Sequence, residues 1–116
     1  MHAEQQLWRT EKYRVMYYSQ AHYNQIRHMM RDGCTLEELQ QTINEALTLT
    51  PTDGSRSNAL QHMWGYFKKQ TTDEQKARYI KLLEEKQWGA LRAYLATLAQ
   101  QYNVVYLQQS TILQQD

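Results

Sequence analysis

The chain has 116 residues, a formal net charge of +1 and one cysteine, Cys34. A chain of this length forms one domain whose core needs no disulfide, and a single cysteine excludes an internal disulfide and an all-cysteine metal or iron–sulfur site. No stretch of about 18 apolar residues is present, and no apolar signal segment follows the polar N-terminus, so we expect no membrane span and a cytosolic location.

The spacing of apolar residues predicts two helices in the first part of the chain. One runs from about residue 4 to residue 31, and Gly33 follows it as a C-terminal cap with a left-handed backbone. The next begins at Thr35, which opens a capping box. It ends near Thr48, because Pro51 cannot continue a helix.

The third expected helix starts at Ser55 or Ser57 and stops near Gln70, and its two faces differ. One face is an ordinary core stripe made by Leu60, Met63, Trp64 and Phe67. The other face carries five dissimilar polar or bare groups, from Asn58, His62, Gly65, Tyr66 and Lys69. A glycine inside a helix costs about 1 kcal/mol relative to alanine. Gly65 therefore predicts the close approach of a neighbouring helix or of a ligand, and we favour a helix.

A second capping box, at Thr72, begins a fourth helix that runs to about Lys86. Its expected inward residues are Ala77, Ile80 and Leu83. The last helix has the most regular apolar spacing, through Trp88, Leu91, Leu95, Leu98 and Tyr102.

These elements predict an all-α fold, a compact single-domain bundle of four to five mostly antiparallel helices. The domain is expected to span residues 1–116, with its core over about residues 7–107. The tail after Asn103 is partly apolar and rich in glutamine. It is expected to dock as an extended arm or a short turn, or to be flexible over residues 108–116.

Enzyme signatures are mostly absent. The chain has no glycine-rich phosphate loop and no H-E-x-x-H, C-x-x-C or G-x-S-x-G motif, and its four histidines lack metal-ligand spacing, so we expect no cofactor and no metal. His62 is a candidate general base, but no acid lies near it in the sequence to orient its ring. A structural histidine bonded to Asn58, one turn earlier, is the favoured interpretation, and binding is favoured over catalysis.

Positive charge is concentrated in two segments. Residues 12–31 and residues 54–72 contain several lysines and arginines and no acid, and five of the nine tyrosines lie in them. A nearly neutral chain with segregated charge can still present one basic surface. Lys68 and Lys69 also lie at a helix end, where the helix dipole alone favours cations.

A line of polar residues follows one face of the first expected helix: Lys12, Ser19, Tyr23 and Arg27. Two interpretations stay open. Ser19 and Tyr23 can face Asn58 and His62 in a hydrogen-bonded helix interface, or the same groups can line a groove for an anionic, hydrogen-bonding ligand.

The motif residues resemble those of the YbgA-like bacterial family, a domain of unknown function, over about residues 7–107. The matching features are Lys12, the run Ser19-Gln20-x-x-Tyr23, and Asn58-x-Leu60 followed by Gly65-Tyr66-Phe67 with His62 between them. The chain departs from the family pattern in having Arg56-Ser57 before Asn58 and in lacking an aromatic, proline-rich tail. The resemblance implies a helical domain found alone or fused to an iron–sulfur desulfidase that acts on thiolated uracil, including thiouridine in transfer RNA.

The first functional hypothesis is therefore an accessory module that binds structured RNA such as transfer RNA. Phosphate contacts are expected from Lys12, Arg14, Arg27, Arg56, Lys68 and Lys69. Tyr23, Tyr66 or Trp64 would stack on an unpaired base. Asn58 or His62 would bond to a base edge, and Gln20 belongs to the same candidate site.

Two alternatives are kept. One is a protein-interaction module that docks on a separate enzyme, such as a desulfidase, through the last helix and the tail over residues 104–113. The other, less favoured, is a small-molecule binder or enzyme that uses Asn58, His62, Tyr66 and Lys12 around a pocket.

Overall fold

The computed structural model describes residues 2–114 of the chain. The regular structure in this range is all helical, which confirms the all-α prediction. Residues 2–114 form seven α-helices and one 3₁₀ turn, more than the four to five helices expected. In chain order they are α1 (Ala3–Tyr18), α2 (Gln20–Asp32), α3 (Leu36–Leu47), α4 (Asp53–Trp64), α5 (Asp73–Glu84), α6 (Trp88–Gln101), α7 (Val105–Gln108) and η1 (Thr111–Leu113).

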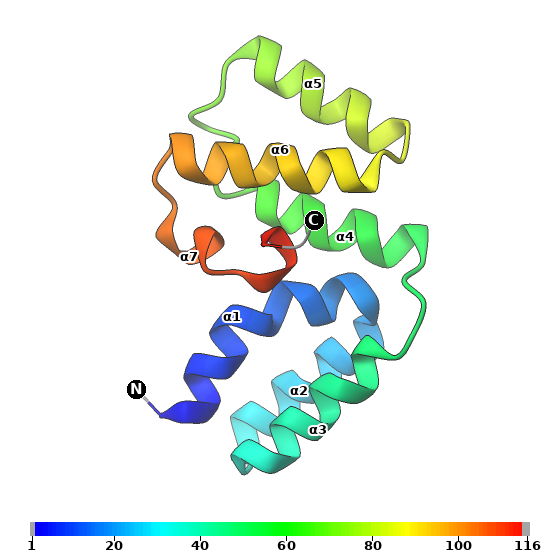
Figure 1. The fold of residues 1–116 in the computed structure, drawn as a ribbon, viewed down its shortest axis with the longest axis vertical. Coiled ribbons are helices and arrows are strands. Elements are labelled where there is room, and N and C mark those ends of the chain that lie inside the picture. Colours follow the sequence, from blue (N-terminus) through cyan, green and yellow to red (C-terminus); the bar gives the residue numbers. More distant parts are fainter. Residues whose placement is uncertain (1, 115–116) are drawn as a thin grey trace.

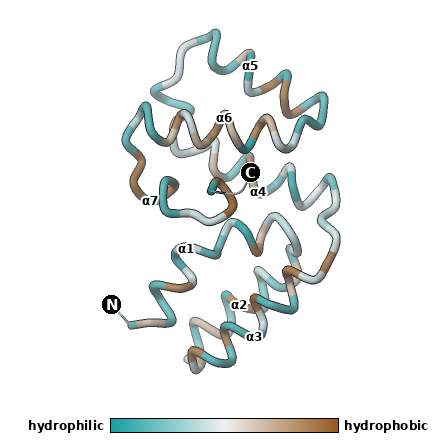
Figure 2. The backbone as a smooth tube through the Cα atoms, viewed as in Figure 1, coloured by the Kyte–Doolittle hydropathy of each residue, from teal (hydrophilic) through white to brown (hydrophobic). Residues whose placement is uncertain are grey.

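Helix α1 runs through the middle of the molecule. Figure 1 shows α2 and α3 side by side on one side of α1, and α4, α6 and α5 in succession on the other. Hydrophobic and hydrophilic residues are interspersed along the helices (Figure 2), as expected where each helix buries part of its circumference. No helix within residues 2–114 has both the length and the apolar character that a membrane crossing needs.

Two hydrophobic clusters share α1. The smaller one contains Trp8 and Val15 of α1, Ile26 of α2, and Leu39 and Ile43 of α3. The larger one contains residues of α1, α4, α5, α6 and the tail. Helix α1 is therefore buried on two sides where it contributes to both clusters, most completely over its C-terminal half.

The first expected helix is interrupted at Ser19, so the prediction of one helix over residues 4–31 is wrong. Ser19 has an extended backbone, with φ −160° and ψ 109°. Its Oγ accepts a hydrogen bond from the backbone N–H of His22 at 3.2 Å and lies 2.7 Å from His22 Nδ1. Serine is among the best N-cap residues, because its hydroxyl satisfies an N–H that the first turn leaves unpaired. Ser19 thus starts a new helix without glycine or proline.

Helix α4 also differs from its prediction. It is capped by Thr52, with Ser55 as the partner in the capping box, and it ends at Trp64. Gly65 is the C-cap, so it does not lie inside a helix as expected. A Cβ at Gly65 would lie 3.2 Å from the carbonyl oxygen of His62, and no atom of another helix in residues 2–114 lies within 4 Å. Gly65 relieves crowding in its own turn, and no neighbouring helix approaches it, so the favoured expectation of a helix at Gly65 is wrong.

The remaining boundaries agree with the sequence. The capping boxes at Thr35 and Thr72 are both formed, and Leu91, Leu95 and Leu98 of α6 are buried. The inward face of α5 was predicted wrongly. Ala77 and Ile80 are exposed, and of the three expected inward residues only Leu83 packs against the core, half-buried. Tyr79 is buried instead and stacks on Trp64 with ring centroids 4.1 Å apart and planes 4° apart.

The tail docks on the bundle as two short helical turns, α7 and η1. Leu107 and Ile112 are fully buried, and Thr111 Oγ1 donates to the carbonyl oxygen of Thr10 at 3.2 Å. Figure 1 shows this segment between α1 and α6. As far as residue 114, the tail is therefore part of the core; residues 115 and 116 lie outside the described range.

Removing a buried tail side chain should destabilise the whole domain. We expect Leu107→Ala to lower the free energy of unfolding by about 2–5 kcal/mol, because it leaves a cavity in the core. Val105→Ala is the matched control on the same short helix, since Val105 is 49% exposed, and it should change stability by less than about 1 kcal/mol. Urea denaturation followed by circular dichroism measures both. Equally small effects would contradict a docked tail.

Candidate functional site

Most of the residues singled out in the sequence lie in three separate places. The first is a cavity between α2 and α4, here called the amide pocket, which includes Ser19, Gln20 and Asn58. The second is the phenol cluster of Tyr13, Tyr23, Tyr66 and Tyr106. The third is the lysine groove beyond the end of α4, lined by Trp64, Lys68, Lys69, Lys76, Tyr79 and Ile80.

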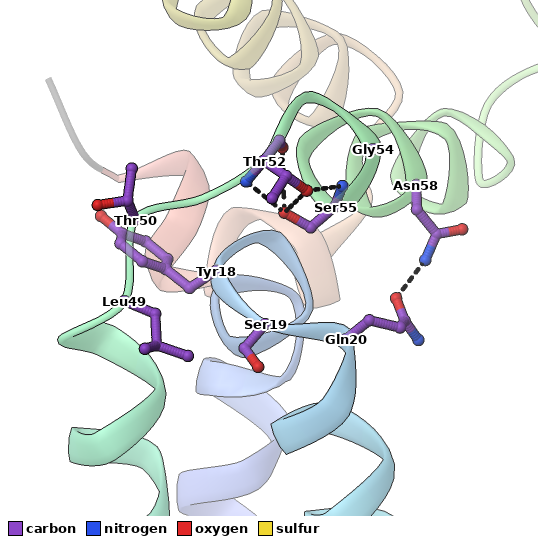
Figure 3. A pocket seen from close by; sticks show the side chains of 9 residues that line it. All are labelled: Tyr18, Ser19, Gln20, Leu49, Thr50, Thr52, Gly54, Ser55 and Asn58. Carbon is purple, nitrogen blue, oxygen red and sulfur yellow. Dashed lines mark hydrogen bonds between the residues drawn. The ribbon is translucent and has the colours of Figure 1, made fainter.

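The amide pocket has a volume of about 510 Å³. It exists because the chain breaks at Ser19 and because the loop before α4 passes over this break. Ser55 at the start of α4 holds the two elements together, since its Oγ donates to the carbonyl oxygen of Tyr17 at 2.8 Å. The lining residues, drawn in Figure 3, are Tyr18, Ser19, Gln20, Leu49, Thr50, Thr52, Gly54, Ser55 and Asn58.

One hydrogen bond between two amides closes a side of this pocket. Asn58 Nδ2 donates to Gln20 Oε1 at 2.6 Å. The bond uses one donor and one acceptor, and it leaves the Gln20 amide nitrogen and the Asn58 oxygen available. The contact with Asn58 is therefore made by Gln20, and not by Ser19 or Tyr23, which one interpretation of the sequence placed opposite Asn58 and His62. Ser19 instead bonds within its own helix, to His22.

The phenol cluster joins α1, α2, the turn after α4 and α7. Tyr13 Oη and Tyr66 Oη are 2.9 Å apart, and the Tyr66 ring packs edge-on against Tyr106 at 5.8 Å. Burial, then the Tyr66 hydrogen bond, raises the pKa of Tyr13 far above its usual range. Tyr13 therefore stays a neutral phenol, and this cluster acts as a packed, hydrogen-bonded junction.

Two arginines cover the outer rings of the phenol cluster. The Arg9 guanidinium lies 4.7 Å from the centre of the Tyr106 ring, and that of Arg27 lies 5.8 Å from the centre of the Tyr23 ring. Both arginines are exposed. Tyr23 also packs against Trp8, at 5.9 Å. The exposed faces of these aromatic side chains are therefore partly taken by the chain's own cations.

The lysine groove has a volume of about 420 Å³. Lys68 and Lys69 reach it from the turn after α4, and Lys76 reaches it from the first turns of α5. All three lysines are exposed. Within residues 2–114 none of them forms an ion pair with a carboxylate. Three uncompensated ammonium groups around one concave surface attract anions.

Arg56 does not belong to this basic surface. It lies in the first turn of α4, at the opposite end from Lys68, and its Nη1 is 3.5 Å from Asp53 Oδ1. Asp53 also accepts from Lys86 at 3.2 Å and from the indole N–H of Trp88 at 3.1 Å. These two hydrogen bonds, Lys86 first, lower the pKa of Asp53. Asp53 thus ties α4 to the α5–α6 connection, and Arg56 pairs with it from the same helix turn.

His62 and Lys12 stand apart from the three regions. The His62 side chain is exposed and makes no hydrogen bond within the described residues, so the prediction of an imidazole bonded to Asn58 is wrong. Lys12 is half-buried on α1. In residues 2–114 no three histidine, cysteine or acidic side chains gather to hold a metal ion.

Sequence reasoning missed several lining residues. Tyr18, Leu49 and Thr50 come to the amide pocket from the end of one helix and from a loop, and no periodic pattern places a loop against a helix end. Lys76 was missed because the capping box at Thr72 was interpreted only as a helix start. The sequence did contain a signal for Lys76: a short turn separates Lys69 from the capped helix that carries Lys76, so the two lysines can lie close together.

A family model described as "Protein of unknown function (DUF1722)" matches residues 12–116. The match includes every candidate site residue named in the sequence, from Lys12 onward. No curated protein and no solved structure matches the chain. Any assignment of function therefore depends on the surfaces described above.

Buried phenols should make the protein sensitive to alkali. Burial raises the pKa of Tyr79 from 10.0 to about 12. Its contribution to stability is complete below pH 10 and is lost as the pH rises toward 12, because the unfolded phenol ionises first. Tyr79→Phe keeps the stack on Trp64 and should reduce the loss of unfolding free energy at about pH 11 by up to about 1 kcal/mol. Urea titrations at several alkaline pH values test this, and an unchanged pH dependence in the variant would contradict it.

Proposed function

The chain belongs to the protein family of unknown function DUF1722, and we propose that it is an accessory module that binds structured RNA, such as transfer RNA, in the cytosol. The lysine groove carries the proposal. Lys68, Lys69 and Lys76 surround one concavity, and no carboxylate among residues 2–114 neutralises them. Such a surface suits a chain of phosphates, which positions a nucleic acid without reading its sequence.

The aromatic residues of the lysine groove form its floor and are not expected to stack on a base. Trp64 and Tyr79 are stacked on one another and nearly buried, so they cannot also sandwich a base. Ile80, at 48% exposure, offers an apolar contact for a ribose or base beside the phosphates. Phosphate binding is therefore assigned to the lysines, and the stacked rings of Trp64 and Tyr79 hold α4 against α5 beneath them.

The choice of transfer RNA as the ligand to test comes from the resemblance of Lys12, Gln20, Asn58 and Tyr66 to the YbgA-like pattern. The resemblance implies a domain found alone or fused to a desulfidase that acts on thiolated uracil, so RNA with thiolated bases is the substrate we propose for a partner enzyme. With one cysteine, this chain would supply binding, and the proposal assigns it no catalytic residue and no cofactor.

Docking on a separate protein through the last helix and the tail is not favoured. The apolar residues of those elements, among them Leu95, Leu107 and Ile112, are fully buried in the chain's own core. A partner could reach them only if the domain opened. A catalytic role for His62 is not favoured either, because His62 and Tyr66 do not line the amide pocket that holds Asn58.

Reversing one charge in the lysine groove should weaken RNA binding in a salt-dependent manner. We expect Lys76→Glu to reduce affinity for transfer RNA about 3- to 10-fold near 100 mM salt, and to lower the slope of log K against log salt by about 1, since one phosphate contact is lost. Fluorescence anisotropy at four or more salt concentrations measures both quantities.

Lys81→Glu is the matched control, because Lys81 is exposed on the same helix but five residues further on, where about 100° per residue turns it to another side. It should change the affinity much less than Lys76→Glu does. The double variant Lys68→Glu, Lys69→Glu should lose more affinity for transfer RNA than either single variant does. Binding that does not depend on salt, or equal losses in the Lys76 and Lys81 variants, would disprove the proposal.

A further inference from the structure

We propose that the amide pocket binds a single unpaired nucleobase. No charged side chain lines this cavity, although it lies on a chain rich in lysine, arginine and acid. Without a charged side chain, the cavity offers no ion pair to a phosphate, a carboxylate or an amine. We therefore expect the bound group to be uncharged, with any phosphate attached to it outside the cavity.

The polar groups in the pocket offer both donors and acceptors. Beyond the bond that joins them, Gln20 presents an amide nitrogen and Asn58 presents an amide oxygen. The hydroxyls of Tyr18 and Thr50 also make no hydrogen bond to any residue in the range 2–114. Unpaired polar groups in a cavity favour a ligand that pairs with them, and the edge of a nucleobase carries donors and acceptors in alternation.

The shape of the pocket supports a flat ligand. Figure 3 shows the ring of Tyr18 with Leu49 and Thr50 on one side, and the bonded amides of Gln20 and Asn58 on the opposite side. Leu49 is 44% exposed, which leaves an apolar side chain at the rim for a ligand to cover. A base edge placed against the amides brings its ring toward Tyr18, and an aromatic ring is the usual stacking partner of an unpaired base.

The volume is adequate for such a ligand. Small-molecule pockets usually measure about 300–1,000 Å³, and this one measures about 510 Å³. Its walls are also well held. The capping box of Thr52 and Ser55 fixes the start of α4, Ser55 bonds to the end of α1, and Ser19 caps α2. The recognition groups are thus attached to three fixed helix ends.

The inference deepens the proposed function and rests on it for the natural ligand, a base within RNA. Lys68 and Lys69 lie beyond the far end of α4, whose 12 residues extend about 18 Å. A base in the amide pocket and phosphates in the lysine groove would therefore belong to nucleotides several positions apart. Structured RNA, with one base turned out of its stack, meets that geometry.

Free nucleosides test the pocket without phosphates. Uridine, cytidine, adenosine and guanosine are titrated into the full chain, with ribose as the control sugar, and the side-chain amide signals of Gln20 and Asn58 are followed by NMR. We expect saturable shifts of these signals with at least one nucleoside and none with ribose. Absence of saturable shifts with all four nucleosides, or an equal response to ribose, would overturn the proposal.

Substitutions then locate the binding. Three substitutions in the pocket should each reduce the affinity for the nucleoside about 10-fold or more: Asn58→Ala and Gln20→Ala through loss of a contact with the base edge, and Tyr18→Leu through loss of stacking. Gln61→Ala is the matched control, an amide on the same helix that bonds to Ser57 outside the pocket, and it should bind as the unchanged chain does. Melting temperatures confirm that each variant folds. If Gln61→Ala binds as weakly as the three pocket variants, the site is not here.

The two proposals can fail independently. If nucleosides bind but transfer RNA shows no salt-dependent affinity, the RNA function is disproved and the pocket remains a nucleobase site. If transfer RNA binds and is weakened by Lys76→Glu, while nucleosides cause no shifts and Asn58→Ala has no effect, the base pocket is disproved and the RNA function remains.

Discussion

Helix α1 is the element on which the rest of the fold depends, because it is buried on two sides at once. Its adjacent residues Val15 and Met16 are both buried, yet they belong to different hydrophobic clusters. One cluster joins α1 to α2 and α3, and the other joins it to α4, α6 and the tail. A helix in this position cannot simply continue into solvent. The chain turns at Ser19, and α2 then packs against α1 while the tail closes the other side.

The same turn creates the amide pocket. The backbone is extended at Ser19, and the Ser19 hydroxyl caps the start of α2 by accepting a hydrogen bond from an N–H of its first turn. The next residue, Gln20, then lies opposite Asn58. The loop before α4 completes the cavity with Leu49 and Thr50. The chain must reverse beside α1, and this reversal places the amides of Gln20 and Asn58 around the amide pocket.

Pairing separates the basic residues into two kinds. Arg56 lies beside Asp53, while Arg9 and Arg27 lie over tyrosine rings. In contrast, Lys68, Lys69 and Lys76 meet no carboxylate within residues 2–114. The acid-free segments of the sequence therefore do not form one uniform basic surface. Cations that stay unpaired and converge on a concavity are the ones expected to attract phosphates.

The sequence by itself determined the helical class, the capping boxes at Thr35 and Thr72, and the buried stripe of α6, because these depend on local hydrogen bonds and on the spacing of apolar residues. The tertiary structure alone decided the break at Ser19, the inward face of α5 and the docking of the tail, since each depends on which distant surface is available for burial. The candidate sites divide in the same way. Gln20, Asn58, Lys68 and Lys69 were recognisable as unusual residues, but their partners Tyr18, Thr50 and Lys76 come from elsewhere in the chain, and only folding brings them together.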